Sequence, residues 1–104
     1  MTLPTRIEWL DGAKEDLARL GKSDAQRIAD ALGRLRFLDD PRQRLLPYSE
    51  NLKGFWKLRV GDYRVISELR EQGGHLVLVI QVVHRGTPDS ARNVRLLKRR
   101  SEDE

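Results

Sequence analysis

The chain has 104 residues, of which 38% are hydrophobic and 35% charged, and its formal net charge is +4. This length suits one small domain, which we expect to cover residues 1–104. The absence of cysteine excludes disulfides and thiolate metal sites, and two histidines far apart in sequence do not make a zinc site. The sequence shows neither an apolar run long enough to span a membrane nor a signal-peptide pattern, so we expect a cytoplasmic protein without membrane contacts.

The positive charge is concentrated in the second half of the chain. Residues 1–52 contain nine basic and nine acidic residues, whereas residues 53–100 contain eleven basic residues and four acidic ones. The last three residues, Glu102 to Glu104, are all acidic. A local excess of positive charge indicates a polyanionic partner, and the alternative is a basic surface that only faces water.

The first half of the chain predicts a strand followed by two helices. Thr5 to Trp9 alternates polar and apolar side chains, which is typical of a strand. Two helices are then expected over 11–20 and 23–38, separated at Gly21 and ended by Pro41. Their apolar residues recur at helical spacing: Ala13, Leu17 and Leu20 in the first, and Ile28, Leu32, Leu35 and Leu38 in the second. A short link between two such helices predicts a helix hairpin.

The second half predicts strands joined by tight turns. Gly61-Asp62 and Gly73-Gly74 are two-residue turn signals, and Leu76 to Val83 is a nearly continuous run of strand-forming apolar residues. Residues 90–100 are expected as a basic helix or an extended arm, and 96–104 as a mobile charged tail. The predicted fold is α+β with the order β-α-α-β-β-β, in which one antiparallel sheet packs against the N-terminal helix hairpin.

The two turns predict which side chains share a face of the sheet. The first turn predicts four pairs: Val60–Tyr63, Arg59–Arg64, Leu58–Val65 and Lys57–Ile66. The second predicts Leu69–Leu78, Ser67–Ile80, Val65–Val82 and Arg64–Val83. The predicted core face then contains Trp56, Leu58, Val60, Tyr63, Val65, Leu69, Leu78, Ile80 and Val82. The predicted outer face contains Lys57, Arg59, Arg64, Ile66 and Gln81, with Arg85 at the strand end.

Arg59 opposite Arg64 is an unfavourable pair, because like charges across two strands repel. A bound phosphate would remove this repulsion, whereas on a surface without a ligand the two side chains would splay into water. Cleavage of RNA by its own 2′-hydroxyl needs a base, stabilisation of the phosphorane charge and a proton for the leaving oxygen, but no metal. Lys57 is the candidate base, since neighbouring cations disfavour its protonated form. Histidine is a common acid–base residue in catalysis, but alternation directs His84 to the core side, opposite Tyr63.

With these residues identified, the chain resembles the RelE/ParE superfamily of type II toxin–antitoxin toxins. The similarity rests on the helix hairpin, on LKGFWKLRVGDYRVI at 52–66 and on VIQVVHR at 79–85. The chain is more similar to the RelE branch, whose members cut mRNA on the ribosome. The resemblance implies a RelE-like fold and a catalytic set of Lys57, Arg59, Arg64 and Arg85. We further predict that Lys53, Gln81, His84, Arg92 and Arg95 contact RNA.

The resemblance also implies partners and leaves alternatives. The expected partners are a cognate, acidic antitoxin and ribosome-bound mRNA, with operator DNA reached only through the toxin–antitoxin complex; no cofactor is expected. RelE-type toxins commonly carry a tyrosine about six residues after the last-strand arginine, but this chain has no aromatic residue near Ala91. The open alternatives are therefore a ParE-like inhibitor of DNA gyrase and a catalytically weak homologue that acts mainly through antitoxin binding.

Overall fold

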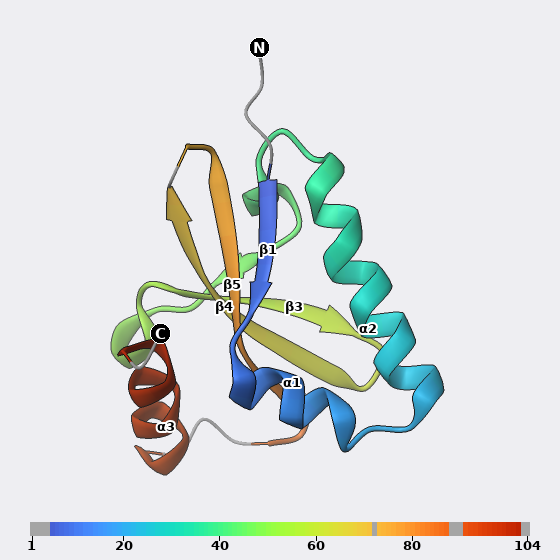
Figure 1. Cartoon of the computed structure of the whole chain (residues 1–104). Helices are drawn as coiled ribbons and strands as arrows, with labels where there is room; N and C mark the ends of the chain where they lie inside the picture. The colour runs from blue at the N-terminus through green and yellow to red at the C-terminus, as the bar shows by residue number, and fades with distance from the viewer. Residues whose placement is uncertain (1–4, 72, 88–90, 103–104) are drawn as a thin grey trace.

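The chain folds into a five-stranded sheet with helices on both faces (Figure 1). The computed structural model describes residues 5–71, 73–87 and 91–102, with residues 91–94 described by their backbone alone. The elements are β1 (Thr5–Trp9), α1 (Asp11–Ala18), α2 (Lys22–Arg34), the 3-10 helices η1 (Leu35–Phe37) and η2 (Pro41–Gln43), β2 (Leu46–Pro47), the 3-10 helix η3 (Glu50–Leu52), β3 (Phe55–Val60), β4 (Tyr63–Glu71), β5 (His75–His84) and α3 (Ala91–Glu102). The predicted α+β class and the order of the predicted elements are confirmed. None of the described helices has the length and apolar character needed to cross a bilayer.

The sheet is mixed rather than purely antiparallel, which corrects the prediction. Its strand order is β1-β5-β4-β3-β2, and β1 pairs with β5 in parallel. Strands β3, β4 and β5 follow one another through tight turns and must therefore be antiparallel. β1 is separated from the other strands by the helix hairpin, and so long a connection permits parallel pairing.

The first turn sets the register as predicted, and the second does so only in part. All four predicted pairs from Val60–Tyr63 to Lys57–Ile66 are present. Between β4 and β5 the pair Val65–Val82 is confirmed, but Ser67 lies opposite Val79 and Leu69 opposite Val77. Next to the turn, Glu71 lies opposite His75, which is one residue away from the pairing that a two-residue Gly73-Gly74 loop gives. A bulge between Ile66 and Ser67, with Ile80 as the extra residue, restores the predicted register beyond it.

The helix hairpin covers one face of the sheet, as expected. The buried residues of this core are Ala13, Ile28, Leu32, Leu35, Leu45, Val60, Val65, Val77, Val79 and Val82. Trp56, Leu58, Tyr63 and Leu69 pack against it while partly buried. Because of the register shift, Val77 and Val79 occupy the places on this face that were predicted for Leu78 and Ile80.

A second core lies on the opposite face, which was predicted to carry mainly cations. It consists of Leu52, Phe55, Ile66, Leu78, Ile80 and Leu97, all of them buried. Leu97 belongs to α3, the helix shown in red in Figure 1, and is only 1% exposed. Residues 96–102 therefore form the end of a packed helix, not a mobile tail; residues 103 and 104 lie outside the described part of the chain.

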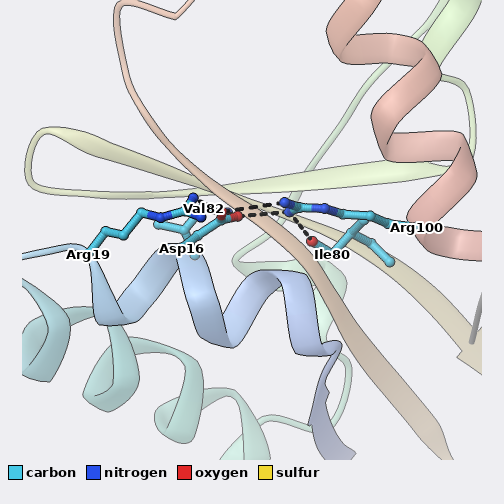
Figure 2. A network of polar contacts seen from close by, with 5 residues as sticks. All are labelled: Asp16, Arg19, Ile80, Val82 and Arg100. Carbon is cyan, nitrogen blue, oxygen red and sulfur yellow. Dashed lines mark hydrogen bonds and ion pairs between the residues drawn. The ribbon is translucent and has the colours of Figure 1, made fainter.

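An ion pair between Asp16 of α1 and Arg100 of α3 closes the open edge of β5 (Figure 2). The pairing of β1 with β5 ends at Trp9–Val79, after which the chain turns into α1. Beyond that point the Val82 N–H donates to Asp16 Oδ2 at 3.1 Å, and Arg100 Nη1 donates to the Ile80 carbonyl at 3.0 Å. Arg100 Nη1 also donates to Asp16 Oδ2 at 2.8 Å. The two side chains thus form hydrogen bonds with the backbone N–H of Val82 and the carbonyl of Ile80, which lie on β5 beyond the end of β1.

Gly12 makes room for this arrangement. A Cβ atom at position 12 would lie 2.7 Å from Nε of Arg100, closer than side chains approach one another. The arginine can therefore lie against the first turn of α1 only because residue 12 has no side chain.

Asp40 caps the short helix η2. Its carboxylate accepts hydrogen bonds from the backbone N–H of Arg42 at 2.9 Å and from the Arg42 guanidinium at 2.7–3.0 Å. These bonds, the side-chain ones first, lower the pKa of Asp40 from 3.8 to about 2.

Replacing Arg100 with alanine should lower the free energy of unfolding by about 2–3 kcal/mol, because the Asp16 carboxylate, which is 10% exposed, loses its closest cation. Chemical denaturation measures this change. The control Arg99→Ala removes an exposed arginine from the same helix and should change stability by less than about 0.5 kcal/mol. Equal effects of the two substitutions would contradict the role given to Arg100.

The Asp40 cap should act only while the carboxyl is ionised. Because folding lowers the pKa of Asp40, its contribution is complete above the ordinary value of 3.8 and is lost as the pH falls through about 2. The stability difference between the native chain and Asp40→Asn should therefore be present at neutral pH and shrink near pH 2. An NMR titration of the Asp40 carboxyl with a midpoint near 3.8 would refute this.

Candidate functional site

Two cross-strand rows at one end of the sheet carry the predicted cations. Lys57, Ile66 and Gln81 form one row across β3, β4 and β5, and Arg59, Arg64 and Val83 form the next. Directly paired residues point to the same face, and so do residues two apart along a strand. Lys57, Arg59, Arg64 and Gln81 therefore share the face on which α3 lies. Part of that face is apolar and packs against α3, and the cationic rows lie beside it.

The side chains of these rows differ widely in exposure. Arg59 is exposed and Lys57 is partly buried. Arg64 is 9% exposed and Gln81 only 5%. An arginine so deeply placed is unusual for a surface that only faces water, since buried guanidinium groups need compensating partners.

Arg64 is held by the chain segment that follows β5. Its Nη2 donates a hydrogen bond to the backbone carbonyl of Thr87. The contact joins the middle strand to the turn after the last strand and orients the guanidinium plane. Arg64 is therefore both a structural residue and a candidate ligand for phosphate.

Lys57 is positioned by an aromatic residue, Tyr48, that no sequence pattern connects with it. Its Nζ lies 5.1 Å from the centre of the Tyr48 ring, a cation–π contact. Tyr48 follows β2 and is bonded to β3 through its backbone N–H, which donates to the Phe55 carbonyl at 3.0 Å. The short strand β2 thus carries the aromatic ring to the lysine. The sequence gives no sign of this contact beyond the presence of Tyr48 itself, because β2 has only two residues and so shows no periodic pattern.

Arg85 lies at the same end of the sheet, in the turn after β5. Its backbone N–H donates to the Asp62 carbonyl at 2.7 Å, and its Nε lies 3.6 Å from Asp62 Oδ1. Both side chains are largely exposed, at 63% and 65%. Arg27 of α2 reaches the neighbouring Gly61-Asp62 turn between β3 and β4, since a Cβ atom at Gly61 would lie 3.0 Å from its Nη1. Asp62 and Arg27 are neighbours of the cationic end that the sequence pattern did not reveal, because both depend on tertiary contacts.

The residues predicted to contact RNA are spread over several places. Gln81 lies within the first row. His84 lies on the opposite face, where its ring meets Tyr63 edge-on at 5.7 Å and its Nδ1 accepts a bond from Gly86 N–H at 3.2 Å. Lys53 is exposed before the start of β3, at the other end of that strand from Arg59. Arg95 is exposed on α3, and the side chain of Arg92 lies outside the described part of the structure.

The chemistry available here is that of cations and hydrogen-bond donors. In the described ranges no group of three or more histidine or acidic side chains could hold a metal ion. Lys57, Arg59, Arg64 and Arg85 offer charge and donors for a phosphate group. The geometry therefore favours anion binding at this end of the sheet.

Comparisons with known proteins agree with the fold. The family model described as ParE toxin of type II toxin-antitoxin system, parDE, matches residues 7–88. No curated protein matches the chain.

Solved structures show the same architecture at low sequence identity. A chain of the toxin–antitoxin complex RelBE2 from Mycobacterium tuberculosis is 23% identical, with a TM-score of 0.70, and the match covers 84% of this chain and 98% of that one. The match to the RelE–RelB complex from Pyrococcus horikoshii OT3 has 23% identity and a TM-score of 0.61, and it covers 85% of this chain and 100% of that one. The YoeB/ParE toxin from Agrobacterium tumefaciens is 17% identical, with a TM-score of 0.61, and the match covers 76% of this chain and 96% of that one. With its fold and most of its sequence matched in this way, the chain belongs to the RelE/ParE family of type II toxin–antitoxin toxins.

Proposed function

We propose that this toxin is an endoribonuclease that cuts ribosome-bound mRNA by attack of the RNA 2′-hydroxyl, and so inhibits translation. The observation that carries the proposal is the gathering of Lys57, Arg59, Arg64 and Arg85 at one end of the sheet. The Gly61-Asp62 turn pairs β3 with β4 and so brings the first three together, and the contacts of Arg85 with Asp62 add the fourth from the turn after β5. Asp62 is an acidic side chain that lies beside Arg85 of this set.

The four cations suit different parts of the reaction. Lys57 is the candidate base for the 2′-hydroxyl, because an arginine does not readily lose a proton. Arg59 and Arg64 would stabilise the charge that develops on the phosphorane. Arg64 is already oriented by the Thr87 carbonyl, so little reorganisation would be needed when the phosphate binds. Arg85 is exposed and could follow the substrate backbone.

The proposed partner in the resting cell is an acidic antitoxin. Three of the similar solved structures are complexes of RelB and RelE proteins, and two of these are described as toxin–antitoxin complexes. An acidic segment would neutralise the cationic rows of this chain and would thereby exclude RNA. Operator DNA would be bound only by the toxin–antitoxin complex.

A second candidate function is inhibition of DNA gyrase. It is favoured by the ParE description of the matching family model and by the lack of an aromatic residue near Ala91. In that case the cationic rows would bind a macromolecular partner without RNA chemistry.

Mapping RNA 5′ ends after induction tests the proposal. The native chain should produce cuts within codons of a reporter message, and Lys57→Met should slow this cutting by about 10²-fold or more, since the candidate base is lost. Lys98→Met is the matched control, because Lys98 is an exposed lysine on α3 outside the cationic rows, and it should cut normally. Unchanged message ends together with inhibited supercoiling by purified gyrase would support the second candidate instead.

Arg64→Ala should also abolish cutting and growth arrest, but it removes the contact with Thr87 as well. The stability of the Arg64→Ala variant must therefore be measured by chemical denaturation alongside its mRNA cutting. Full toxicity of a folded Arg64→Ala variant would exclude the proposed role of this face.

Asp62→Asn should strengthen binding of single-stranded RNA, by up to about fivefold at low salt, because it removes a negative charge beside Arg85. The backbone bond between Arg85 and Asp62 would remain, so the turn should keep its shape. Fluorescence anisotropy at several salt concentrations measures the effect. Glu8→Gln, an equal charge change at an exposed position of β1, should leave the affinity unchanged, and equal gains in both variants would point to net charge alone.

A further inference from the structure

The turn that follows β5 holds one of the candidate cations from outside its own strand. Arg64 belongs to β4 and is 9% exposed, and its guanidinium donates a hydrogen bond to the backbone carbonyl of Thr87. A backbone carbonyl moves only when the chain around it changes conformation. The direction of the Arg64 guanidinium therefore depends on the shape of the turn over residues 84–87.

His84 binds this turn with both its backbone and its side chain. Its carbonyl accepts a hydrogen bond from the Thr87 N–H at 2.9 Å, and its Nδ1 accepts one from the Gly86 N–H at 3.2 Å. The second bond has the pattern of an Asx turn, in which a side-chain acceptor binds the N–H two residues further on. The Arg85 N–H, between these two donors, binds the Asp62 carbonyl at 2.7 Å. The backbone donors of three successive residues are thus bound, and that of Gly86 is bound by a side chain.

The imidazole ring lies on the opposite face of the sheet from Arg64. Val83 pairs with Arg64, and successive residues of a strand point to opposite faces. His84 pairs instead with Tyr63, and the two rings meet edge-on at 5.7 Å. A phosphate bound by Arg64 would lie on the other side of the sheet from the imidazole. His84 can therefore influence this arginine only through the turn.

The bond to Gly86 specifies the state of the ring. Nδ1 accepts a hydrogen bond only when it carries no proton, so a neutral ring in this geometry has its proton on Nε2. An imidazolium donates from both nitrogens and could not accept the bond. The side chain of His84 thus acts as an acceptor that is directed at the turn.

We propose that His84 is a positioning residue for RNA cleavage, which binds the Gly86 N–H and so fixes the turn whose Thr87 carbonyl orients Arg64. Without this bond the turn could adopt other conformations, and the carbonyl would hold the guanidinium less well. A displacement of about 1 Å at a reacting centre can cost on the order of 10²-fold in rate. The effect on cleavage rests on the proposed nuclease function, whereas the role of His84 in the turn does not.

Two substitutions separate the acceptor of His84 from its ring. His84→Asn supplies a side-chain oxygen that can bind the N–H two residues further on, but it loses the ring contact with Tyr63. His84→Phe keeps an aromatic ring beside Tyr63 but has no acceptor. Because His84 is exposed, both variants should fold, which chemical denaturation checks. His75→Phe is the matched control, since His75 is the other histidine of the chain and lies at the opposite end of β5.

Cutting of a message on purified ribosomes, with the toxin in excess, tests the proposal. His84→Phe should lower the rate constant at saturating toxin by about tenfold or more, because Arg64 acts on the transition state, and should leave the half-saturating concentration unchanged. His84→Asn and His75→Phe should both cut at close to the native rate.

Three results would overturn the proposal. The first is a His84→Phe variant that cuts at the native rate, and the second is a His84→Asn variant that is as slow as His84→Phe. The third is a raised half-saturating concentration with an unchanged rate constant, which would indicate that the imidazole contacts RNA or the ribosome directly.

NMR of the Arg64 guanidinium tests the positioning without RNA. In the native chain the bound guanidinium should give separate signals for its two Nη groups, because the hydrogen bond slows its internal rotation. These signals should stay separate in His84→Asn and merge in His84→Phe, and any other pattern would reject the role of His84. The expected pattern in a chain that cuts no message would leave that role standing and reject the nuclease function.

Discussion

The register of β5 against β4 decides what each face of the sheet can do. The bulge at Ile80 lets the strand bring Leu78 and Ile80 to the same face as Ile66, while Val77, Val79 and Val82 face the helix hairpin. One face thus becomes an apolar core under two helices. The other is divided into an apolar part beneath α3 and a cationic part at the end of the sheet. Without the bulge, one of the two cores would lose its apolar residues to the opposite side.

The apolar part of the outer face explains why α3 packs there. Leu97 fills it, and Arg100 extends from the same helix to Asp16 and the Ile80 carbonyl (Figure 2). A single arginine therefore joins α3, α1 and β5. Shortly after β5, the Thr87 carbonyl accepts a hydrogen bond from the guanidinium of Arg64. Packing of α3 and placement of the most buried cation are in this way parts of one arrangement.

The cationic rows could be derived from the sequence because they depend on a local turn. Gly61-Asp62 determines the pairing of β3 with β4, and that pairing places Lys57, Arg59 and Arg64 on one face. The contacts that surround the rows could not be derived in this way. Tyr48 reaches Lys57 through an irregular two-residue strand, and Arg27 reaches Gly61 from a helix far away in sequence. Such contacts follow from the way helices and strands pack together, and no periodic pattern in the sequence predicts them.

The sequence by itself determined the α+β class, the helix hairpin, the first register and the cations of the outer face, because each depends on turn chemistry or on a regular period. The tertiary structure decided the parallel pairing of β1, the shifted register beside the second turn with its compensating bulge, and the packing of α3. These features depend on which apolar surfaces remain to be covered after the local elements have formed. The sheet edge beside Arg59 belongs with them, since β2 begins only at Leu46, opposite Lys57.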